Sequence, residues 1–418
     1  MKRLIFIVGS TETLEYFSFQ VAEYFLAAGR EVFLWDMRHP VSSINAFEAL
    51  EDPENSILIT FNFIGLCGEG QFGEGLGNIW DVNGIEKICI MVDSPVYYYR
   101  QLSSNMENLK LFCIDRYHQE FVERYYPFYG KAGFLPLAGN KPLCSFFAKP
   151  GILKPGDITW FEIGGKEENF EEWNSRSIDV LFTGNYVPPE SLEPSISHLG
   201  PEYKAFVKDV AREVTERYSE PFERVITERL TGEFPESSED ELLQALHGMV
   251  YVDLYVRNIY RGKIVTALAD RGLKVYCTGK DWDKAPCKHP ENIIHTGDSV
   301  VSLQCLEAMS RAKISLNMMP WFKAGAHDRV FSSMLSGCVC LSDSSEYLDE
   351  VIGGRGVFCE YKLKDPESSA ALAADLAAGL LADPEGAYGI AFAGKKLASE
   401  DHTWKERAKF LELFTNNS

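Results

Sequence analysis

The second half of the chain contains four consecutive stretches that decide its fold: ISLN (314–317), MMPWFKAGA (318–326), HDRVFSSMLSG (327–337) and CVCLSD (338–343). A short apolar run leads into a loop, a helix is expected to begin near His327, Gly337 allows a turn, and a second apolar run follows. This order predicts two parallel strands joined by a crossover helix, which is the repeating unit of an α/β sheet.

The first turn of that helix predicts an anion site. Its free N–H groups and its dipole favour an anion, and His327 and Arg329 add donors that suit a diphosphate. An arginine in a first turn opposes the helix dipole, so an anion is expected between them. The alternative is that Asp328 caps the helix while Arg329 pairs with a surface carboxylate.

The same alternation of short apolar runs and amphipathic stretches fills residues 3–136. The expected strands are 4–8, 31–35, 57–61, 88–92, 111–114 and 133–135, with helices such as 13–28 and 116–126 between them. Buried parallel strands with helical crossovers predict a doubly wound sheet. Residues 137–177 break the rhythm with prolines, glycines and acidic residues, which indicates a connection between domains.

A second α/β sheet is expected from residue 178. Its strands are predicted at 178–183, 273–277, 292–295, 313–317, 338–342 and 357–360, with helices around 300–311, 327–336 and 366–382. The segment 201–271 is charged and helical, and the tail 384–417 is expected to be helical throughout. The predicted domains are 1–140, a connection 141–177, a domain 178–400 with a helical insertion at about 186–260, and a closing helix 401–418.

Composition excludes several classes of protein. The 418 residues include 61 acidic and 41 basic side chains, a net charge of −20, with 45% hydrophobic residues. This composition supports large cores and disfavours disorder and a nucleic-acid partner. No run of eighteen apolar residues occurs, so no transmembrane segment is expected and the cytoplasm is the expected compartment. The ten cysteines contain no CxxC pair, as expected of reduced thiols.

Five motifs in order resemble one known family. The motifs are Asp179-Val-Leu-Phe-Thr-Gly184-Asn185, Val275 to Gly279 followed by Trp282, His295-Thr-Gly297-Asp298, the stretch around His327-Asp-Arg-x-Phe331, and His402-Thr-Trp404 to Arg407. Together they are similar to the corresponding segments of the GT-B glycosyltransferases, particularly the group-1, spore-maturation (CgeB-like) branch. Ile57 to Asn62 and Met91 to Pro95 resemble its N-terminal domain. The resemblance covers most of the chain and implies two Rossmann-like doubly wound parallel-sheet domains that face each other across a cleft.

The resemblance also implies a function. A GT-B enzyme of this kind would move a hexosyl or deoxyhexosyl group from a nucleoside-diphosphate sugar to an acceptor hydroxyl on a glycan or protein, in bacterial surface-glycan or protein glycosylation. It would need no cofactor and no metal, and the formation of a homo-oligomer is left open. The implied nucleotide-sugar site comprises Gly184, Asn185, Gly279, Thr296, Gly297, Asn317, His327, Asp328, Arg329, Val330 and Phe331.

The chain departs from the family at two positions. Retaining relatives tend to carry two glutamates eight positions apart, where this chain has Ala324 and Ser332. The usual sugar-hydroxyl contact is therefore not expected here, and neither inversion nor retention follows from the sequence.

Three residues are expected to act in catalysis: His327 and Arg329 at the phosphates, and Asp93 as general base. Asp93 follows the strand 88–92 and precedes Ser94-Pro95, and the alternative for it is a turn in which its carboxylate bonds its own backbone. Glu69 and Glu74 rank below it, because their glycine-rich surroundings position a carboxylate poorly.

Other patterns have a structural interpretation. Gly68-Glu-Gly70-Gln-Phe-Gly73 matches GxGxxG but does not directly follow a strand, so a loop over the cleft is expected. Asp281-Trp-Asp283 and Cys287-x-His289 are expected to bind no metal. The many carboxylates of the insertion, Glu223 among them, predict a solvated helical layer, with acceptor recognition or dimerisation as a further role. Arg257, Arg261 and Lys263 are expected on a solvated face, although Arg257 and Arg261, one turn apart, could reach the cleft.

Three other functions stay open from the sequence. They are a nucleotide-sugar epimerase on the same scaffold, a non-catalytic glycan- or partner-binding protein, and a dinucleotide oxidoreductase that uses the glycine-rich stretch. The nucleotide base, the sugar and the acceptor depend on side chains from several loops that the sequence alone does not bring together.

Overall fold

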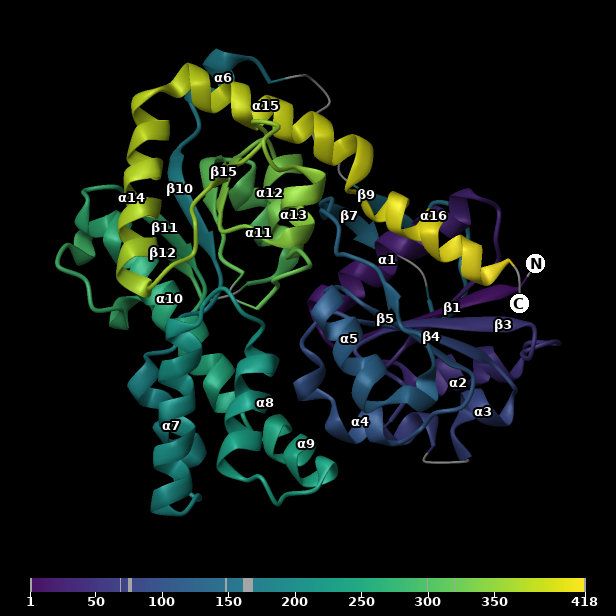
Figure 1. The fold of residues 1–418 in the computed structure, drawn as a ribbon. Helices are drawn as coiled ribbons and strands as arrows, with labels where there is room; N and C mark the ends of the chain where they lie inside the picture. Colours follow the sequence, from purple (N-terminus) through teal and green to yellow (C-terminus); the bar gives the residue numbers. More distant parts are fainter. Residues whose placement is uncertain are drawn as a thin grey trace.

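The chain folds into two α/β domains that lie side by side and are joined by a long C-terminal helical arm (Figure 1). The computed structural model describes residues 2–67, 69–73, 77–146, 149–160, 168–298, 300–319 and 321–416. Both domains are built on largely parallel sheets with crossover helices, so the expected two-domain Rossmann-like architecture is confirmed.

The N-terminal sheet has the strand order β6-β5-β4-β3-β1-β2-β8. Its strands are β1 (Arg3–Val8), β2 (Val32–Asp36), β3 (Ser56–Phe61), β4 (Glu86–Met91), β5 (Leu109–Cys113), β6 (Gly133–Phe134) and β8 (Gly151–Ile152). The helices are α1 (Glu12–Ala27), α2 (Pro40–Glu48), α3 (Ile79–Val82), α4 (Tyr99–Ser103) and α5 (Arg116–Tyr125). All strands pair in parallel except β8, which runs antiparallel to β2.

Burial on both faces explains the apolar strands of this domain. β1 and β2 are almost wholly buried, as parallel strands covered by helices must be. Below the sheet, Trp35 packs against Phe72 and Trp80 with ring centroids 4.9 and 5.4 Å apart. Through this aromatic cluster, the segment after β3 packs against the core of the domain.

The C-terminal sheet is wholly parallel, with the order β12-β11-β10-β13-β14-β15. Its strands are β10 (Ile178–Thr183), β11 (Val275–Thr278), β12 (Ile293–Gly297), β13 (Ala312–Leu316), β14 (Val339–Ser342) and β15 (Cys359–Glu360). The helices that cross over or close the domain are α11 (Ser302–Met309), α12 (Asp328–Leu335), α13 (Glu346–Val351), α14 (Pro366–Ala382) and α15 (Pro384–Asp401). The predicted strand–helix–strand unit is therefore β13–α12–β14, and α13 was not foreseen.

The segment between the domains has its own structure. β8 joins the N-terminal sheet, β7 (Leu143–Phe146) pairs antiparallel with β9 (Ile158–Trp160), and α6 (Phe170–Asn174) precedes β10. The N-terminal domain thus takes part of the segment that the sequence assigns to the connection, because β2 leaves an edge that β8 covers.

The insertion is helical, as expected, and among its carboxylates Glu223 is buried, contrary to the expectation of a solvated face. It folds as α7 (Pro201–Glu216), α8 (Phe222–Glu233), α9 (Glu239–His247) and the first half of α10 (Val250–Asp270). Phe222, Val225 and Ile226 are fully buried, and Glu223 is only 6% exposed. Glu223 is buried because Ser94 Oγ, in the N-terminal domain, donates a hydrogen bond of 2.6 Å to its carboxylate. The insertion therefore packs against the other domain.

The C-terminal tail is helical, and its last part forms a separate closing helix that returns toward the N-terminal domain, as expected. It breaks at His402 and Thr403 between α15 and α16 (Trp404–Thr415), and α16 lies over α1 of the N-terminal domain (Figure 1). Gly139 donates its N–H to the carbonyl of His402 (2.8 Å), and Trp404 stacks near Phe17 with ring centroids 4.6 Å apart. These contacts redirect the chain so that α16 closes on the first domain.

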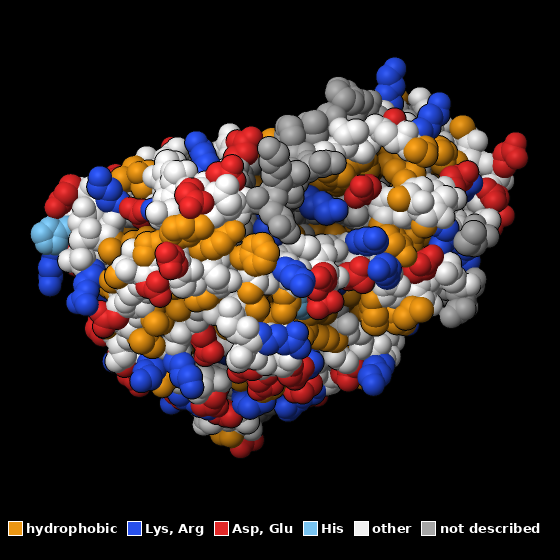
Figure 2. Space-filling view, turned by 90° about the horizontal axis from the view of Figure 1, so that it is seen from above, with side chains coloured by type: hydrophobic (Ala, Val, Ile, Leu, Met, Phe, Trp, Pro, Cys, Tyr) orange, Lys and Arg blue, Asp and Glu red, His pale blue; other side chains and the backbone are white. Residues whose placement is uncertain are grey.

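The surface carries mixed charge. On the face that Figure 2 shows, Lys and Arg side chains are interspersed with Asp and Glu side chains, and the described part of that face has no broad basic patch. None of the helices in the described ranges combines the length and the apolar character needed to span a membrane.

Candidate nucleotide-sugar site

A pocket of about 370 Å³ lies where the two domains meet. Its C-terminal wall comes from the turn after β10, the start of α12, one face of α11 and one face of α10. Thr13 and Asn140 close it from the N-terminal domain. The carboxyl ends of parallel strands and the N-terminus of α12 thus meet in one place, as in other doubly wound folds.

Hydrogen bonds of His327 and Asp328 fix the position of the N-terminus of α12. His327 Nδ1 accepts the backbone N–H of Arg329 at 3.2 Å and so caps the helix. Asp328 accepts a hydrogen bond of 2.8 Å from Asn140 Nδ2, across the domain boundary. The capping alternative for Asp328 is therefore wrong, since its carboxylate lies between His327 and Asn140 and does not accept from the helix backbone.

The electrostatics of this helix start disfavour protonation of His327. Burial, together with the neighbouring Arg329, lowers the pKa of His327. Burial opposes ionisation of Asp328, but His327, Arg329 and Asn140 outweigh it and hold the pKa of Asp328 below its usual value. A neutral imidazole accepts at one ring nitrogen, and here Nδ1 accepts the backbone N–H of Arg329.

Arg329 points from α12 toward the turn after β10. Nη1 donates to the carbonyl of Thr183, and Nη2 lies 3.1 Å from His327 Nε2. Gly184 follows at φ 150°, and a Cβ there would lie 3.1 Å from Arg329 Nη1. A side chain at position 184 would therefore crowd the guanidinium and fill the pocket.

Two further arginines reach the pocket from α10. Arg257 is bound by Asp253 through contacts of 2.7 to 3.1 Å, and Arg261 Nη1 donates to the carbonyl of Asn185 at 2.9 Å. Nε of Arg261 is buried and has no hydrogen-bond partner among the described residues. The solvated face expected for Arg257 and Arg261 is therefore wrong, since both line the pocket between the domains.

The three guanidinium groups repel one another. Burial, followed by the charges of Arg257 and Arg329, lowers the pKa of Arg261 far below its usual value, and burial also lowers the pKa of Arg329. Within the described chain, neither Arg261 nor Arg329 forms an ion pair with a carboxylate. Such a cluster is favourable only when an anion binds between its members.

The other residues predicted to bind the nucleotide-sugar lie in two different places. Gly279, Thr296 and Gly297 are at the carboxyl ends of β11 and β12, outside the lining of this pocket; Thr296 Oγ1 lies 2.7 Å from Thr278 Oγ1. Asn317, Val330 and Phe331 are buried in the domain interior. Asn317 donates to Ser342 Oγ at 2.9 Å, and Phe331 stacks on His402 at 4.1 Å.

Asp93 lies just after β4, with its carboxylate accepting from Asn62 Nδ2 (2.8 Å) and Tyr98 OH (3.2 Å). The adjacent Ser94 bonds Glu223, whose carboxylate also lies 3.3 Å from His118 Nε2. Side-chain donors thus orient Asp93, and its place is the seam where the N-terminal domain meets the insertion. It is not part of the pocket lining.

Ala324 and Ser332, which stand where retaining relatives tend to carry glutamates, make hydrogen bonds between the two domains. Ala324 N–H donates to the buried carboxylate of Asp115 at 2.8 Å, and Ser332 Oγ accepts the N–H of Asn140 at 2.9 Å. Sequence reasoning missed Asn140 and Thr13, because no local pattern marks a residue whose partner lies almost two hundred positions away in sequence.

The remaining motifs have structural partners. Glu69 accepts the N–H of Gly65 (2.9 Å), whereas Gly68 and Glu74 lie outside the described residues. Asp281 pairs with Lys284, and Cys287 donates to Asp270. Across the described ranges, no group of three or more His, Cys, Asp or Glu residues is arranged to hold a metal ion.

Comparisons with known proteins agree with this geometry. Residues 261–412 match the model of a family described as glycosyl transferase-like. A glycosyltransferase from Rickettsia africae ESF-5 superposes over 100% of this chain and 99% of its own, with a TM-score of 0.51 and 10% identity. This chain has the GT-B fold of glycosyltransferases.

A second GT-B structure has a bound donor. Anabaena Alr3699/HepE in complex with UDP-glucose covers 100% of both chains, with a TM-score of 0.51 and 8% identity. A search of curated proteins finds no match to this chain. The GT-B architecture is thus shared over the whole length, and the narrower CgeB-like branch stays a prediction.

Proposed function

We propose that this GT-B protein is a glycosyltransferase that moves a sugar from a nucleoside-diphosphate sugar to an acceptor hydroxyl. One observation supports this proposal above the others. Arg257, Arg261 and Arg329 converge beside the N-terminus of α12 and the turn at Gly184, although the chain as a whole has a net charge of −20. A diphosphate is the anion that fits a fork of guanidinium groups at a helix start.

The arginines would stabilise the leaving group. As the bond from the sugar to the diphosphate breaks, negative charge grows on the phosphate oxygen, and preformed donors lower the barrier at that point. The N–H groups at the start of α12 would add to this effect, because they point along the same direction as the helix dipole. Gly184 leaves the backbone accessible to the diphosphate and ribose.

The acceptor would approach from the N-terminal domain. Asp93 is our candidate for the base that takes the hydroxyl proton, because Asn62 and Tyr98 orient its carboxylate and the neighbouring Ser94 contacts the insertion. Positions 324 and 332 carry no glutamate, so other groups would have to contact the sugar hydroxyls.

The fold relatives suggest which donor to test first. HepE is crystallised with UDP-glucose, so UDP-hexoses head the set. A role in bacterial surface-glycan or protein glycosylation, with a glycan or protein as acceptor, is the biological setting we propose.

A non-catalytic nucleotide-binding protein is the second candidate, because the positions usually held by glutamates bear Ala324 and Ser332. It would bind a nucleoside diphosphate and turn over no sugar. The oxidoreductase has less support: within 69–73, Phe72 packs against Trp35 and Trp80, and the segment forms a short 3-10 turn where a dinucleotide fold needs a helix start.

A thermal-shift screen tests the proposal. The purified protein is heated with UDP, GDP, TDP, CDP, their sugars, NAD(H) and NADP(H), and the best ligand is then incubated with protein to follow release of free sugar or transfer to acceptors. A ligand at a hundred times its Kd stabilises the fold by about 2.7 kcal/mol. A shift with one nucleoside diphosphate supports the site; a shift with only the nicotinamide compounds contradicts it.

A further inference from the structure

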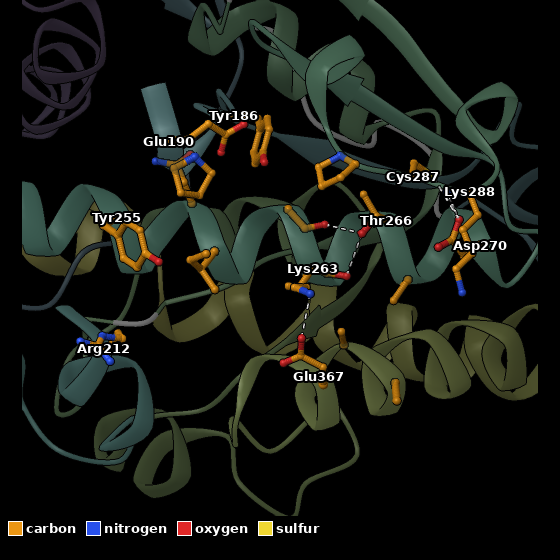
Figure 3. A pocket seen from close by; sticks show the side chains of 18 of the residues that line it. Tyr186, Glu190, Arg212, Tyr255, Lys263, Thr266, Asp270, Cys287, Lys288 and Glu367 are labelled. Carbon is orange, nitrogen blue, oxygen red and sulfur yellow. Dashed lines mark hydrogen bonds and ion pairs between the residues drawn. The ribbon is translucent and has the colours of Figure 1, made fainter. Parts of the chain in front are cut away.

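The helices of the insertion face different neighbours. Between α7, α10 and α14 lies a hollow of about 1040 Å³, which Lys263 and Glu367 cross with an ion pair of 2.7 Å (Figure 3). The residues that line this hollow all belong to the C-terminal domain. α8 and α9 instead contact the N-terminal domain, toward which they lie in Figure 1. The link between the insertion and the acceptor side is therefore made by α8 and α9.

The residue that follows the candidate base Asp93 is held from the other domain. Ser94 Oγ donates to the carboxylate of Glu223, the second residue of α8, at 2.6 Å. Both side chains are buried, so water does not compete for this hydrogen bond to a carboxylate. Since Asp93 and Ser94 are neighbours in the chain, Glu223 helps to set where the backbone of Asp93 lies.

Two further contacts come from α9. His247, at its C-terminal end, contacts the carbonyl of Val96 through Nδ1, and Asp240 accepts a hydrogen bond of 3.3 Å from Tyr99 OH. Val96 lies in the short turn η3 (Pro95–Tyr97), and Tyr99 begins α4. The segment 94–99 is thus bound by the insertion at three points.

The start of α8 also contacts the donor side. Phe222, next to Glu223, is fully buried and packs on Trp321 with ring centroids 4.6 Å apart. Trp321 lies in the loop between β13 and α12, and the ring of the neighbouring Phe322 lies 5.9 Å from that of His327. Two consecutive residues of α8 therefore contact the loop that leads to the arginine pocket and the segment that follows the candidate base.

His118 of α5 supports the buried carboxylate of Glu223. Its Nε2 lies 3.3 Å from Glu223, and its ring lies 6.2 Å from that of Phe322. Burial disfavours a charge on His118, but Glu223 and two further carboxylates outweigh it and raise the pKa of this histidine. A protonated His118 balances the charge of Glu223, so placing this carboxylate between the domains costs less free energy.

We propose that Glu223 is a positioning residue for sugar transfer: it holds Ser94 and thereby keeps Asp93 where it reaches the acceptor hydroxyl. The insertion of one domain then completes the acceptor side of the other. The inference rests on the proposed function, because it takes Asp93 as the base. A base acts only within hydrogen-bond reach of the proton it removes, so a displaced Asp93 slows transfer without weakening donor binding.

Hydrogen exchange tests the contact without any substrate. Glu223→Leu keeps the bulk of the side chain and removes the acceptor, whereas Glu223→Gln keeps an oxygen for Ser94. Glu228→Leu is the matched control, because Glu228 is an exposed residue of the same helix. The proposal predicts amide exchange at 94–99 that is at least about tenfold faster in Glu223→Leu and within about threefold of the wild type in the other two.

Kinetics test the role in transfer, with the donor that the thermal-shift screen selects. Glu223→Leu should lower kcat at least about tenfold, while the KM of the donor stays within about threefold and Glu223→Gln retains kcat. Ser94→Ala removes the donor of the same hydrogen bond from the other domain. The double variant should be no slower than the slower single variant, because both substitutions break one bond.

The proposal is overturned by unchanged exchange at 94–99 in Glu223→Leu, by faster exchange with unchanged kcat, or by an equal effect of Glu228→Leu. Effects of the two single variants that multiply in the double variant also overturn it, as does a rise in donor KM as large as the fall in kcat. Failure of the proposed function is seen separately, as a wild-type protein that transfers no sugar. The exchange measurement then still decides whether Glu223 holds the segment 94–99.

Discussion

Replacing Arg329 with alanine is expected to remove most of the affinity for a nucleoside diphosphate. Two of its five N–H groups are used inside the protein, one toward the Thr183 carbonyl and one toward Nδ1 of His327, which leaves up to three for the ligand. A hydrogen bond to a charged group contributes about 1.5–3 kcal/mol, so loss of about 3 kcal/mol, roughly 150-fold in Kd, is the expected effect.

Folding should be nearly unaffected. The substitution removes a contact with Thr183, but it also relieves repulsion with Arg261, so the free energy of unfolding is expected to change by less than about 1 kcal/mol. Arg271→Ala serves as the control, because Arg271 is exposed and pairs only with the exposed Asp375 on the far side of α10.

Isothermal titration with UDP, or with the nucleotide that the screen selects, measures the effect. The reasoning is refuted if Arg329→Ala binds within about threefold of the wild type, since one charged hydrogen bond already corresponds to about tenfold.

Four further expectations follow from the structure. Gly184→Ala should abolish nucleotide binding in the same titration, whereas Gly272→Ala, at φ 90° in open space, should lower only the melting temperature. Asp93→Asn should leave binding intact and slow sugar transfer by at least about 100-fold in a kcat assay. Gly325→Ala should force the domains apart, because its Cβ would lie 2.2 Å from the Ile114 carbonyl; an increased radius of gyration in X-ray scattering would show it. Burial lowers the pKa of His247 to about 4, so the free energy of unfolding should fall by about 3 kcal/mol between pH 6.5 and pH 4 as the unfolded chain takes up a proton. His247→Phe should remove this dependence of the free energy of unfolding on pH, as measured in denaturant titrations.

The sign of the pH effect follows from the bonds of His247. Nδ1–H donates to the carbonyl of Val96 and Nε2 accepts from Tyr126 OH at 2.9 Å, so the folded protein holds the neutral ring. Unfolding frees it to its ordinary pKa near 6.5, and protons therefore favour the unfolded state below that pH. A wild-type stability that stays constant from pH 6.5 to 4 would contradict this assignment.

Elements whose signal is local were predictable from sequence. The unit β13–α12–β14 and the helix Pro366–Ala382 lie where the apolar spacing places them, because burial of a strand or of one helix face depends on residues close in sequence. The arginine at the start of α12 was also recognisable, since a cation in a first turn is unusual.

Contacts between distant segments were not predictable. The sequence places the start of the closing helix near His402 but not the hydrogen bond from Gly139 N–H to the His402 carbonyl, and it does not show that Ser94 of the other domain donates to Glu223. Asn140 enters the pocket by bonding Asp328. Each partner lies more than a hundred residues away, and neither periodicity nor turn chemistry encodes such a pairing.

A structure of the protein crystallised with the nucleoside diphosphate that stabilises it most tests the central claim most directly. The account predicts the diphosphate between Arg261 and Arg329, against the N-terminus of α12 and beside Gly184. A nucleotide bound elsewhere, with these two arginines free of phosphate, would contradict it.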